Sequence, residues 1–544
     1  MSVDWEGEIV WLKHSRLLSV LTLLSFVAAP CLAADGTGGA KADGGSETIT
    51  ADIVIAGAGL SGLAAGLTGV ENGAKVVIFE KLPGIGGAGN YPEGSFGINS
   101  RLQKQSGDPR YNKSPEEAFA AGVEFHHWRL NSALLSTLIR NSGDTMDWLQ
   151  DEGIKFKGIK TMFPPEKSLG VWHIYEGHGA RVVQTMYRKF ASLGGQLYLE
   201  TPVKSLLTGK DGRVIGIVAE DAHGKKYNVY AKGVILATGG FASNQAMLQK
   251  YVTDINAKGM LAGVRYRGPL IDGRTGDGIN MAMGQGAAVQ SMNVLAGNAP
   301  YLDTKEPPIY QFNGPDSLKQ MRTALSQPFL WVNQHGDRFY NESLGSAFVD
   351  VYNAITANGG VMYSVFDENM KNRLVNEGPY TPFNAIVVVG QKMTALDEGL
   401  KKGLEGGYAF KADTIPELAK MIHVDPAALE ATMSKINAYA EAGKDPDFGR
   451  KPEHLFKFNP TGPYYALKGI RAFFLTCGGV KVNASMQAVN DRDEPIPGLY
   501  VTGQDMGGLS DTSYDLLLEG EASGFALTSG RLAARNIVTT ELAK

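Results

Sequence analysis

The chain has 544 residues, of which 43% are hydrophobic and 20% charged, and its formal net charge is −4. This length exceeds what a single hydrophobic core usually serves, so we expect at least two domains. The nearly balanced charge gives no sign of a nucleic-acid partner or of binding to an anionic membrane surface. The two cysteines, Cys31 and Cys477, are too few for an iron–sulfur cluster or a cysteine zinc site, and no CxxCH motif for covalent haem occurs.

The N-terminal segment has the pattern of an export signal. A basic stretch from Lys13 precedes an apolar run at 17–29, and the small residues Ala33 and Ala34 follow. The alternative is a membrane anchor, but the run is short for a spanning helix. We therefore predict that residues 1–34 are a cleaved signal peptide and that the mature protein is periplasmic or otherwise extracytoplasmic.

The strongest local signal is an apolar strand at 53–56 that leads directly into a GxGxxG motif and a helix rich in small residues. In this motif Gly57 permits a tight turn, and Gly59 lets the backbone approach a pyrophosphate. Gly62 lets the helix pack closely against the strand. The free N–H groups at the start of that helix favour a phosphate, so the pattern predicts a dinucleotide site.

A second strand and an acid complete this unit. The strand at 75–79 ends at Glu80, whose carboxylate is placed to accept hydrogen bonds from ribose hydroxyls. A glycine-rich loop at 81–90 follows, and two more apolar strands run into glycines at 234–240 and 495–503. Strand–glycine elements spread over so much of the chain favour an extended dinucleotide that is contacted from both ends of the sequence.

Further motifs follow in a fixed order along the chain: ATGGF at 237–241, TGDG at 275–278, VNQHGDRFYNE at 332–342, CGGVKVN at 477–483 and PIPGLYVTG at 495–503. Together with the GxGxxG unit, they resemble the FAD flavoproteins of the fumarate reductase/succinate dehydrogenase family. The likeness covers about residues 50–540. Within the family, the chain is most similar to soluble, secreted reductases of activated C=C bonds, such as fumarate or urocanate reductases.

The resemblance implies an α/β fold, in which a Rossmann-like FAD-binding domain is interrupted by a smaller α+β capping domain. The segment before the first strand is rich in Gly, Ala and Ser and is typical of a flexible linker. We accordingly divide the chain into a signal peptide (1–34), a linker (35–48), the first part of the FAD-binding domain (49–292), the cap (293–475) and the second part of the FAD-binding domain (476–544).

The resemblance also implies which side chains lie near FAD. Besides the three motif glycines Gly57, Gly59 and Gly62, these are Glu80, Lys81, Gly87, Asn90, Val203, Gly239, Asp277 and Gln504. The family usually has Glu at the position of Gln504, and Gln can still form a hydrogen bond there. The histidine that family members use for covalent attachment is not evident, so we expect FAD to be bound non-covalently.

The catalytic positions depart from those of fumarate reductases. Ser346 stands where the family has the arginine that protonates the substrate, and Phe474 and Leu475 replace a histidine pair. Asn298 falls on a cap histidine, and 507–515 lacks the usual arginine that holds a carboxylate. A dicarboxylate needs cations at both ends, because an unpaired buried charge is costly. We therefore expect a monocarboxylate or a bulkier, more aromatic enoate as substrate, and not fumarate.

Three residues are candidates for the catalytic work. Tyr514 is the predicted proton donor, provided that a cation lies close to it, and Arg265 or Arg267 is the predicted carboxylate anchor. A packed core tyrosine and structural or surface arginines are the alternatives. Histidines such as His173 and His178 have no Cys or Asp that completes a recognisable metal site, so no metal is predicted.

We predict an FAD-dependent reductase of an α,β-unsaturated carboxylate that acts as a terminal step of anaerobic respiration. Because NADH is absent outside the cytoplasm, a separate donor such as a c-type cytochrome or a quinol dehydrogenase would supply the electrons. One alternative is a flavin-dependent dehydrogenase that introduces a C=C bond, as ketosteroid dehydrogenases in the wider family do. A flavin-binding protein without catalysis is the third reading, and the complete set of FAD motifs argues against it.

Overall fold

The computed structural model describes residues 45–161, 169, 171–252, 264–266, 273–306, 308, 310–382, 387–515 and 517–543. All of them belong to the unit that spans residues 44–544. The predicted signal peptide therefore lies outside the described residues. At 264–266 only the backbone is described.

A six-stranded sheet forms the centre of the nucleotide-binding part. Its order is β20-β21-β11-β2-β3-β7, with bounds Gln487–Val489, Pro495–Val501, Gly233–Leu236, Ile53–Ala56, Val76–Phe79 and Gln196–Tyr198. The strands from β21 to β7 run parallel, and β20 alone is antiparallel to its neighbour. β2, β3 and β11 are buried along their whole length. Continuous apolar strands of this kind suit a parallel sheet that is covered on both faces.

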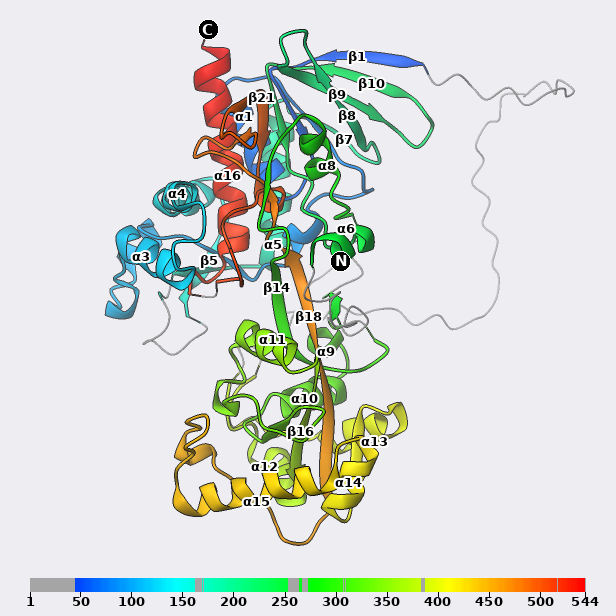
Figure 1. Cartoon of the computed structure of the whole chain (residues 1–544). Coiled ribbons are helices and arrows are strands. Elements are labelled where there is room, and N and C mark those ends of the chain that lie inside the picture. The colour runs from blue at the N-terminus through cyan, green and yellow to red at the C-terminus, as the bar shows by residue number, and fades with distance from the viewer. Residues whose placement is uncertain are drawn as a thin grey trace, which may run out of the picture. The chain divides into compact units, whose positions relative to one another are not determined.

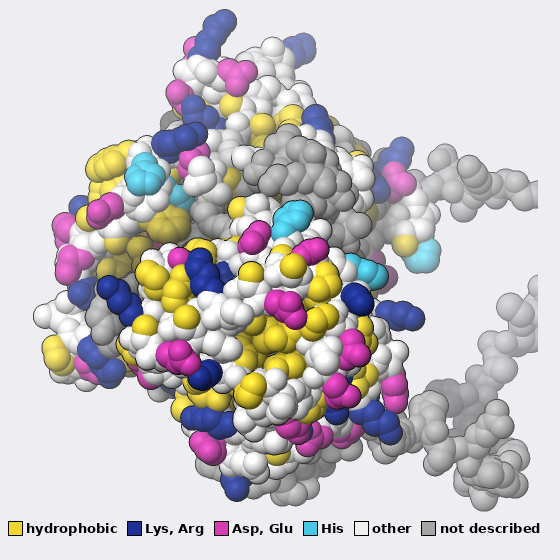
Figure 2. Space-filling view, turned by 60° about the horizontal axis from the view of Figure 1, so that its bottom comes forward, with side chains coloured by type: hydrophobic (Ala, Val, Ile, Leu, Met, Phe, Trp, Pro, Cys, Tyr) yellow, Lys and Arg dark blue, Asp and Glu magenta, His cyan; other side chains and the backbone are white. Residues whose placement is uncertain are grey.

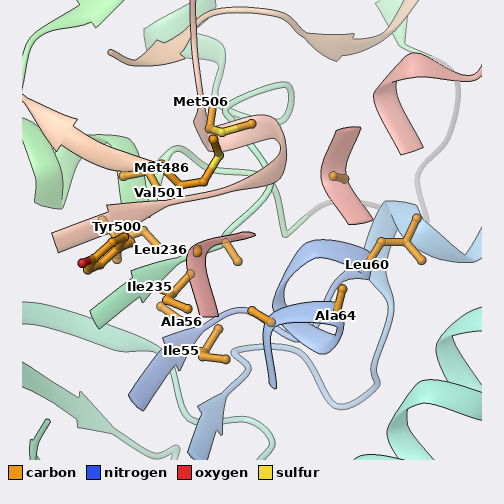
Figure 3. Packing of buried hydrophobic residues seen from close by; sticks show 14 of the residues in the cluster. Ile55, Ala56, Leu60, Ala64, Ile235, Leu236, Met486, Tyr500, Val501 and Met506 are labelled. Atoms are coloured by element: carbon orange, nitrogen blue, oxygen red, sulfur yellow. The ribbon is translucent and has the colours of Figure 1, made fainter. Parts of the chain in front are cut away.

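The helices α1 (Leu60–Glu71) and α16 (Glu521–Ile537) pack against each other beside this sheet, as Figure 1 shows. Small residues make the contact close: a Cβ on Gly530 of α16 would lie 2.1 Å from the Ser61 carbonyl oxygen. Figure 3 shows side chains of β2, β11 and β21 gathering with those of α1 in one core. This arrangement confirms the predicted α/β class and places the start of α1 at the ends of the parallel strands.

The first described strand changes one sequence prediction. β1 (Ser46–Thr50) pairs in parallel with β10 (Lys226–Tyr230). Residues 46–48 are therefore part of a paired strand, and the predicted linker at 35–48 is wrong at its C-terminal end. The physical reason is that Ile49 is buried against the core, which holds the preceding residues in register with β10.

The other strands of this part form small sheets. β1 and β10 continue through β9 and β8 (Val214–Glu220 and Val203–Thr208). A three-stranded sheet has the order β4-β6-β5 and a two-stranded sheet pairs β13 with β19, with bounds Gly94–Phe96, Trp172–Tyr175, Phe156–Lys160, Val289–Gln290 and Gly479–Val480. The further α-helices of this part are α2 (Arg101–Gln105), α3 (Pro115–Phe125), α4 (Ser132–Asp151), α5 (His178–Ser192), α6 (Gln245–Tyr251) and α8 (Asp277–Gly284).

A second sheet is built around the long strand β18 (Tyr464–Thr476) and has its own hydrophobic core. β18 pairs with β12, β16, β14 and β17, and β15 pairs with β16, with bounds Val264–Tyr266, Val361–Asp367, Leu295–Leu302, Ala409–Ala412 and Leu330–Val332. Figure 1 shows β14 and β18 running from the nucleotide-binding part into this second region. Its helices are α9 (Tyr310–Asn313), α10 (Asp316–Leu325), α11 (Phe348–Ala357), α12 (Glu368–Glu377), α13 (Leu396–Gly406), α14 (Ile415–Met421) and α15 (Pro426–Ala442).

Two details of this sheet differ from the predicted domain boundaries. The boundary predicted between 475 and 476 falls inside β18, which continues to Thr476. β12 lies within the range assigned to the first part of the FAD-binding domain (49–292), yet it pairs with β18. A strand pairs where its backbone finds a free edge, and sequence position alone does not show which sheet offers that edge.

The motif at 332–342 stabilises the second region. Glu342, whose side chain is fully buried, accepts from Arg338 at 2.7 Å and pairs with Arg450 at 2.8 Å. Arg338 also pairs with Asp445 at 2.9 Å, and the Arg338 side chain and backbone N–H groups hold the pKa of Asp445 well below its usual range despite its burial. The four charges balance each other, so this part of the family pattern serves the fold rather than the reaction.

On the face seen in Figure 2, basic and acidic side chains are interspersed rather than gathered by sign. Among the described residues, no helix combines the length and apolar character needed to cross a bilayer.

Candidate active site

A cavity of about 630 Å³ runs from the GxGxxG turn to the edge of the second region. It is lined by almost every residue that the sequence predicted to lie near FAD, namely Gly57, Gly59, Glu80, Lys81, Gly87, Asn90, Val203, Gly239, Asp277 and Gln504. Gly62 is the exception. Its Cβ would lie 2.0 Å from the Gly57 carbonyl oxygen, so its place is in the packing of the helix on the turn.

The glycine-rich turn borders the cavity and is tightest at Gly57. Gly57 has φ +107°, and a Cβ there would lie 2.3 Å from the Ala237 carbonyl oxygen. Gly59, Leu60 and Ser61, at the N-terminus of α1, line the cavity. The free N–H groups and the helix dipole at this end make it suited to a pyrophosphate.

Glu80 and Asn90 hold the loop that forms the next wall. The Glu80 carboxylate accepts hydrogen bonds from the Ala58 N–H at 2.8 Å and from the Leu82 N–H at 2.9 Å. The Asn90 amide donates to the Ile85 carbonyl at 3.0 Å. Glu80 is thus fixed at the end of β3 with its carboxylate at the cavity wall, where a ribose would lie.

Lys81 links the first nucleotide-binding unit to the TGDG motif. Its ammonium group lies 2.6 Å from Asp277 Oδ2 and donates to Thr275 Oγ1, also at 2.6 Å. Asp277 is the first residue of α8, where a carboxylate is favoured by the helix dipole. The ion pair with Asp277 therefore balances the charge of Lys81.

Asp505 is a structural residue of the site that the sequence analysis missed. Its buried carboxylate accepts from the Thr238 N–H at 2.5 Å, from the Thr238 hydroxyl at 2.8 Å and from the Gly240 N–H at 2.8 Å. Burial raises the pKa of Asp505, and these donors oppose that rise. The contacts bind the 237–241 turn to the 3₁₀ turn that carries Gln504. In the sequence, only the position of Asp505 directly after Gln504 indicated that it belongs to the site.

The opposite end of the cavity is apolar and aromatic. Phe312, Phe348, Phe474, Leu475 and Tyr514 line it, and all except Phe474 are less than one-tenth exposed. The rings of Phe474 and Tyr514 meet edge to face, with centroids 5.7 Å apart. Sequence analysis had singled out three of these residues; α9 and α11, which bring Phe312 and Phe348, were not assigned to the site.

The three predicted catalytic residues have different outcomes. Tyr514 lines the cavity, as the prediction requires. Arg265 lies in β12 with its backbone beside Ala472 of β18, but its side chain is outside the described part of the chain. Arg267 lies outside the described residues altogether. The described arginine of the cavity is Arg274, which donates to the Phe474 carbonyl at 2.5 Å.

The histidines have structural partners. His173 is fully buried, bonded to Ser100 Oγ at 2.7 Å and to the Val171 carbonyl at 2.9 Å, and burial lowers its pKa to about 4. His178 lines the cavity at the start of α5. Within the residues that the structure describes, no group of three His, Cys, Asp or Glu side chains is arranged to hold a metal ion.

The dimensions and lining fit FAD. The cavity is extended, glycine backbone borders one half, and Glu80 and a helix N-terminus stand where a ribose and a pyrophosphate need partners. The family model described as "FAD binding domain" matches residues 52–516.

Known proteins resemble the chain over most of its length. A vinyl phenol reductase from Lactiplantibacillus plantarum is 31% identical over 491 residues, which cover 89% of this chain and 96% of the relative. A fumarate reductase (cytochrome) from Shewanella frigidimarina is 28% identical, with 89% of this chain and 76% of the relative covered.

Among solved structures, a 3-ketosteroid Δ4-(5α)-dehydrogenase from Rhodococcus jostii in complex with 4-androstene-3,17-dione has a TM-score of 0.68. The match covers 90% of this chain and 97% of that structure, at 23% identity. At this identity the likeness concerns the fold.

Proposed function

The chain belongs to the enoate-reductase-like family of FAD-binding flavoproteins, which includes reductases of C=C bonds, and from this premise we propose that it reduces a C=C bond conjugated with an aromatic ring. The substrate class comprises cinnamate-type acids, which carry one carboxylate, and the corresponding hydroxystyrenes. The reaction adds a hydride to one carbon of the double bond and a proton to the other.

The aromatic end of the cavity carries this proposal. Phe312, Phe348, Phe474 and Tyr514 offer ring faces and edges to a flat, apolar substrate. Aromatic pairs are worth about 0.5–1.5 kcal/mol beyond the burial of their area. The vinyl phenol reductase that covers most of the chain bears a name that points to the same chemical class.

The lining also argues against a dicarboxylate. Lys81 and Arg274, the described lysine and arginine of the cavity, both have protein partners: Lys81 is paired with Asp277 at 2.6 Å, and Arg274 donates to the Phe474 carbonyl at 2.5 Å. Ser346, Leu475 and Asn298 remain where fumarate reductases are expected to have cationic side chains. A second carboxylate without a cation would cost several kcal/mol on burial, which corresponds to a loss of at least about 100-fold in kcat/KM.

Bound FAD supplies the hydride, and the residues of the chain position the reactants. The α1 N-terminus, Glu80 and Gln504 would hold the cofactor along the cavity. Phe348 and Phe474 would orient the ring of the substrate and exclude water. Tyr514 would stand at the carbon that receives the proton. We propose that FAD is held by these non-covalent contacts, so that denaturation in acid should release it into solution.

We further propose that the protein is exported and receives electrons from a separate c-type cytochrome or quinol dehydrogenase. The basic and apolar pattern of residues 1–34 supports export. The fumarate reductase relative is named as a cytochrome-linked enzyme. The N-terminal sequence of the mature protein, determined from the extracytoplasmic fraction of its host, tests this proposal; an intact residue 1–34 segment would contradict it.

The activity is tested by anaerobic oxidation of reduced methyl viologen with the FAD-loaded protein. The substrates are 4-hydroxycinnamate, 4-vinylphenol, acrylate and fumarate. We expect turnover of the aryl compounds and a kcat/KM for fumarate lower by at least about 100-fold. The two aryl compounds show whether the carboxylate contributes to binding. Rapid fumarate turnover contradicts the proposal. No turnover of any compound would favour the dehydrogenase alternative, which oxidation of the saturated aryl compounds with an artificial acceptor would then test.

A further inference from the structure

A second cavity, of about 30 Å³, adjoins the large one. Tyr514 and Gln504 line both cavities, and Cys477, Ser510 and Glu521 line only the small one. A space of this size has room for a water molecule. Tyr514 is therefore part of a wall that the small cavity shares with the large one.

Glu521 is the acid of this small cavity. It is the first residue of α16 and is 4% exposed. No ion pair reaches it from the described residues, and the titratable groups that face it are Asp515, Tyr514 and Cys477, none of them basic. Asp515 is itself 1% exposed.

These surroundings favour the protonated form of Glu521. Placing an unpaired carboxylate in such a site costs several kcal/mol. The N-terminus of α16 would stabilise the charged form by at most about 2 kcal/mol. Desolvation therefore dominates, and burial together with neighbouring Asp515 raises the pKa of Glu521 well above its ordinary value. A carboxyl group with a raised pKa thus lines the same small cavity as Tyr514.

Tyr514 is poorly placed to act as an acid by itself. The predicted cation beside it is not found among its described neighbours: burial, and then Glu521, Cys477 and Asp515, raise the pKa of its hydroxyl. Its oxygen accepts from the Ala522 N–H at 3.3 Å. The raised pKa makes this phenol a weaker acid, so a second proton donor close to it would favour the transfer.

We infer that Glu521 is the proton reservoir of the reaction and supplies the substrate through the hydroxyl of Tyr514. Glu521 is then a positioning residue that acts through Tyr514. The inference rests on the proposed reductase function and adds to it the origin of the proton.

The atoms balance over the two groups. The O–H bond of Tyr514 breaks as the new C–H bond forms on the substrate, and the electron pair for reduction arrives with the hydride. The O–H bond of Glu521 breaks as the phenol is re-formed across one water in the small cavity. The net change is the loss of one proton from Glu521, which solvent restores before the next turnover.

The decisive variant is Glu521→Gln, which keeps the shape of the side chain and removes its acidic proton. Glu519→Gln is the matched control. Glu519 is also buried and lies two residues away, but it lines neither cavity, and its Oε1 accepts from Thr161 at 3.0 Å.

Two readouts are needed. The first is stopped-flow reoxidation of the reduced enzyme by 4-hydroxycinnamate or 4-vinylphenol, with oxygen as the comparison oxidant. We expect Glu521→Gln to slow reoxidation by the alkene about 10²–10⁴-fold, with reoxidation by oxygen and alkene binding to the oxidised enzyme unchanged. Glu519→Gln should behave like the native protein.

The second readout is infrared spectroscopy. The native protein at neutral pH should show the C=O stretch of a protonated carboxyl that Glu521→Gln lacks, and that band should fall during a single turnover of the reduced native enzyme. The turnover measurement in Asp515→Asn, which removes the other buried carboxyl of this region, assigns the band to Glu521 and decides the question even if Glu521→Gln does not fold. A band that stays constant through turnover, or reoxidation of Glu521→Gln by the alkene within about 3-fold of the native rate, overturns the inference. A native enzyme that no alkene reoxidises would instead refute the proposed function on which the inference depends.

Discussion

The two ends of the large cavity are built on different physical principles. At the nucleotide end, backbone N–H groups, glycines and the Lys81–Asp277 pair meet the ligand, and each charge has a partner within hydrogen-bonding distance. At the reaction end, aromatic rings surround Tyr514, and the acids Asp515 and Glu521 lie nearby without a counter-ion from the described residues. The first end is suited to hold a charged cofactor in one position. The second keeps protons on groups that would ionise in water.

Removing the Tyr514 hydroxyl should have the largest effect on the reaction, because it changes the reaction end and leaves the nucleotide end intact. Tyr514→Phe keeps the ring against Phe474 and removes the group that passes the proton. We expect alkene reduction to slow about 10²–10⁴-fold with FAD content unchanged. The control is Tyr91→Phe, because Tyr91 lines the same cavity but is 41% exposed. Single-turnover rates measure the effect, and near-native activity of Tyr514→Phe would remove this residue from the mechanism.

The nucleotide end is tested by Glu80→Ala. The substitution leaves the N–H groups of Ala58 and Leu82 without their carboxylate acceptor. A hydrogen bond to a charged group contributes about 1.5–3 kcal/mol, so FAD affinity should fall about 10–100-fold. Fluorescence titration of the apoprotein with FAD provides the measurement, and Glu93→Ala, at another acid of the cavity wall, is the control. Equal losses of FAD affinity in both variants would mean that Glu80 contributes no more to FAD binding than Glu93.

The buried acids predict a dependence of stability on pH. Burial raises the pKa of Asp515 from 3.8 to about 7. Between these values the folded protein holds a proton that the unfolded chain has lost, so its free energy of unfolding falls as pH rises, by about 1.4 kcal/mol per pH unit for one group. The fall ends above about pH 7, where both states are ionised.

Asp515→Asn should flatten this slope in urea unfolding at a series of pH values. Asp511→Asn is the control, since Asp511 pairs with Arg129 at 3.1 Å on a more exposed part of the same loop. An unchanged slope in Asp515→Asn would show that the carboxyl is ionised in the folded protein and that the reaction end does not hold its protons as we describe.

The smallest expected effect concerns substrate choice. Phe348→Leu keeps apolar volume at the reaction end and removes one aromatic ring. We expect the preference for 4-hydroxycinnamate over acrylate, measured as the ratio of kcat/KM values, to fall about 2–10-fold, as the loss of 0.5–1.5 kcal/mol implies. If both substrates lose activity equally, Phe348 serves packing and does not select an aromatic substrate.

Much of the nucleotide end could be predicted from the sequence, because its determinants are local. The turn at Gly57, the helix behind it and Glu80 lie within about one βαβ unit, and each has a conformational requirement that its residue type reveals. The family resemblance, which rests on motifs of this kind, implied the α/β class. The linker prediction was wrong at residues 46–48, because β1 forms by pairing with β10, which is distant in the sequence.

The reaction end depended on tertiary structure. Phe312, Phe348 and Glu521 come from α9, α11 and α16, and no spacing along the chain shows that these elements meet. The raised pKa of Glu521 and the lack of a described cation beside Tyr514 are likewise properties of what surrounds each group. By itself, the sequence determined that the protein binds a dinucleotide on a parallel sheet, because glycine conformations and strand patterns are local. The tertiary structure decided which acids have a raised pKa and which rings line the cavity, because burial is set by the whole fold.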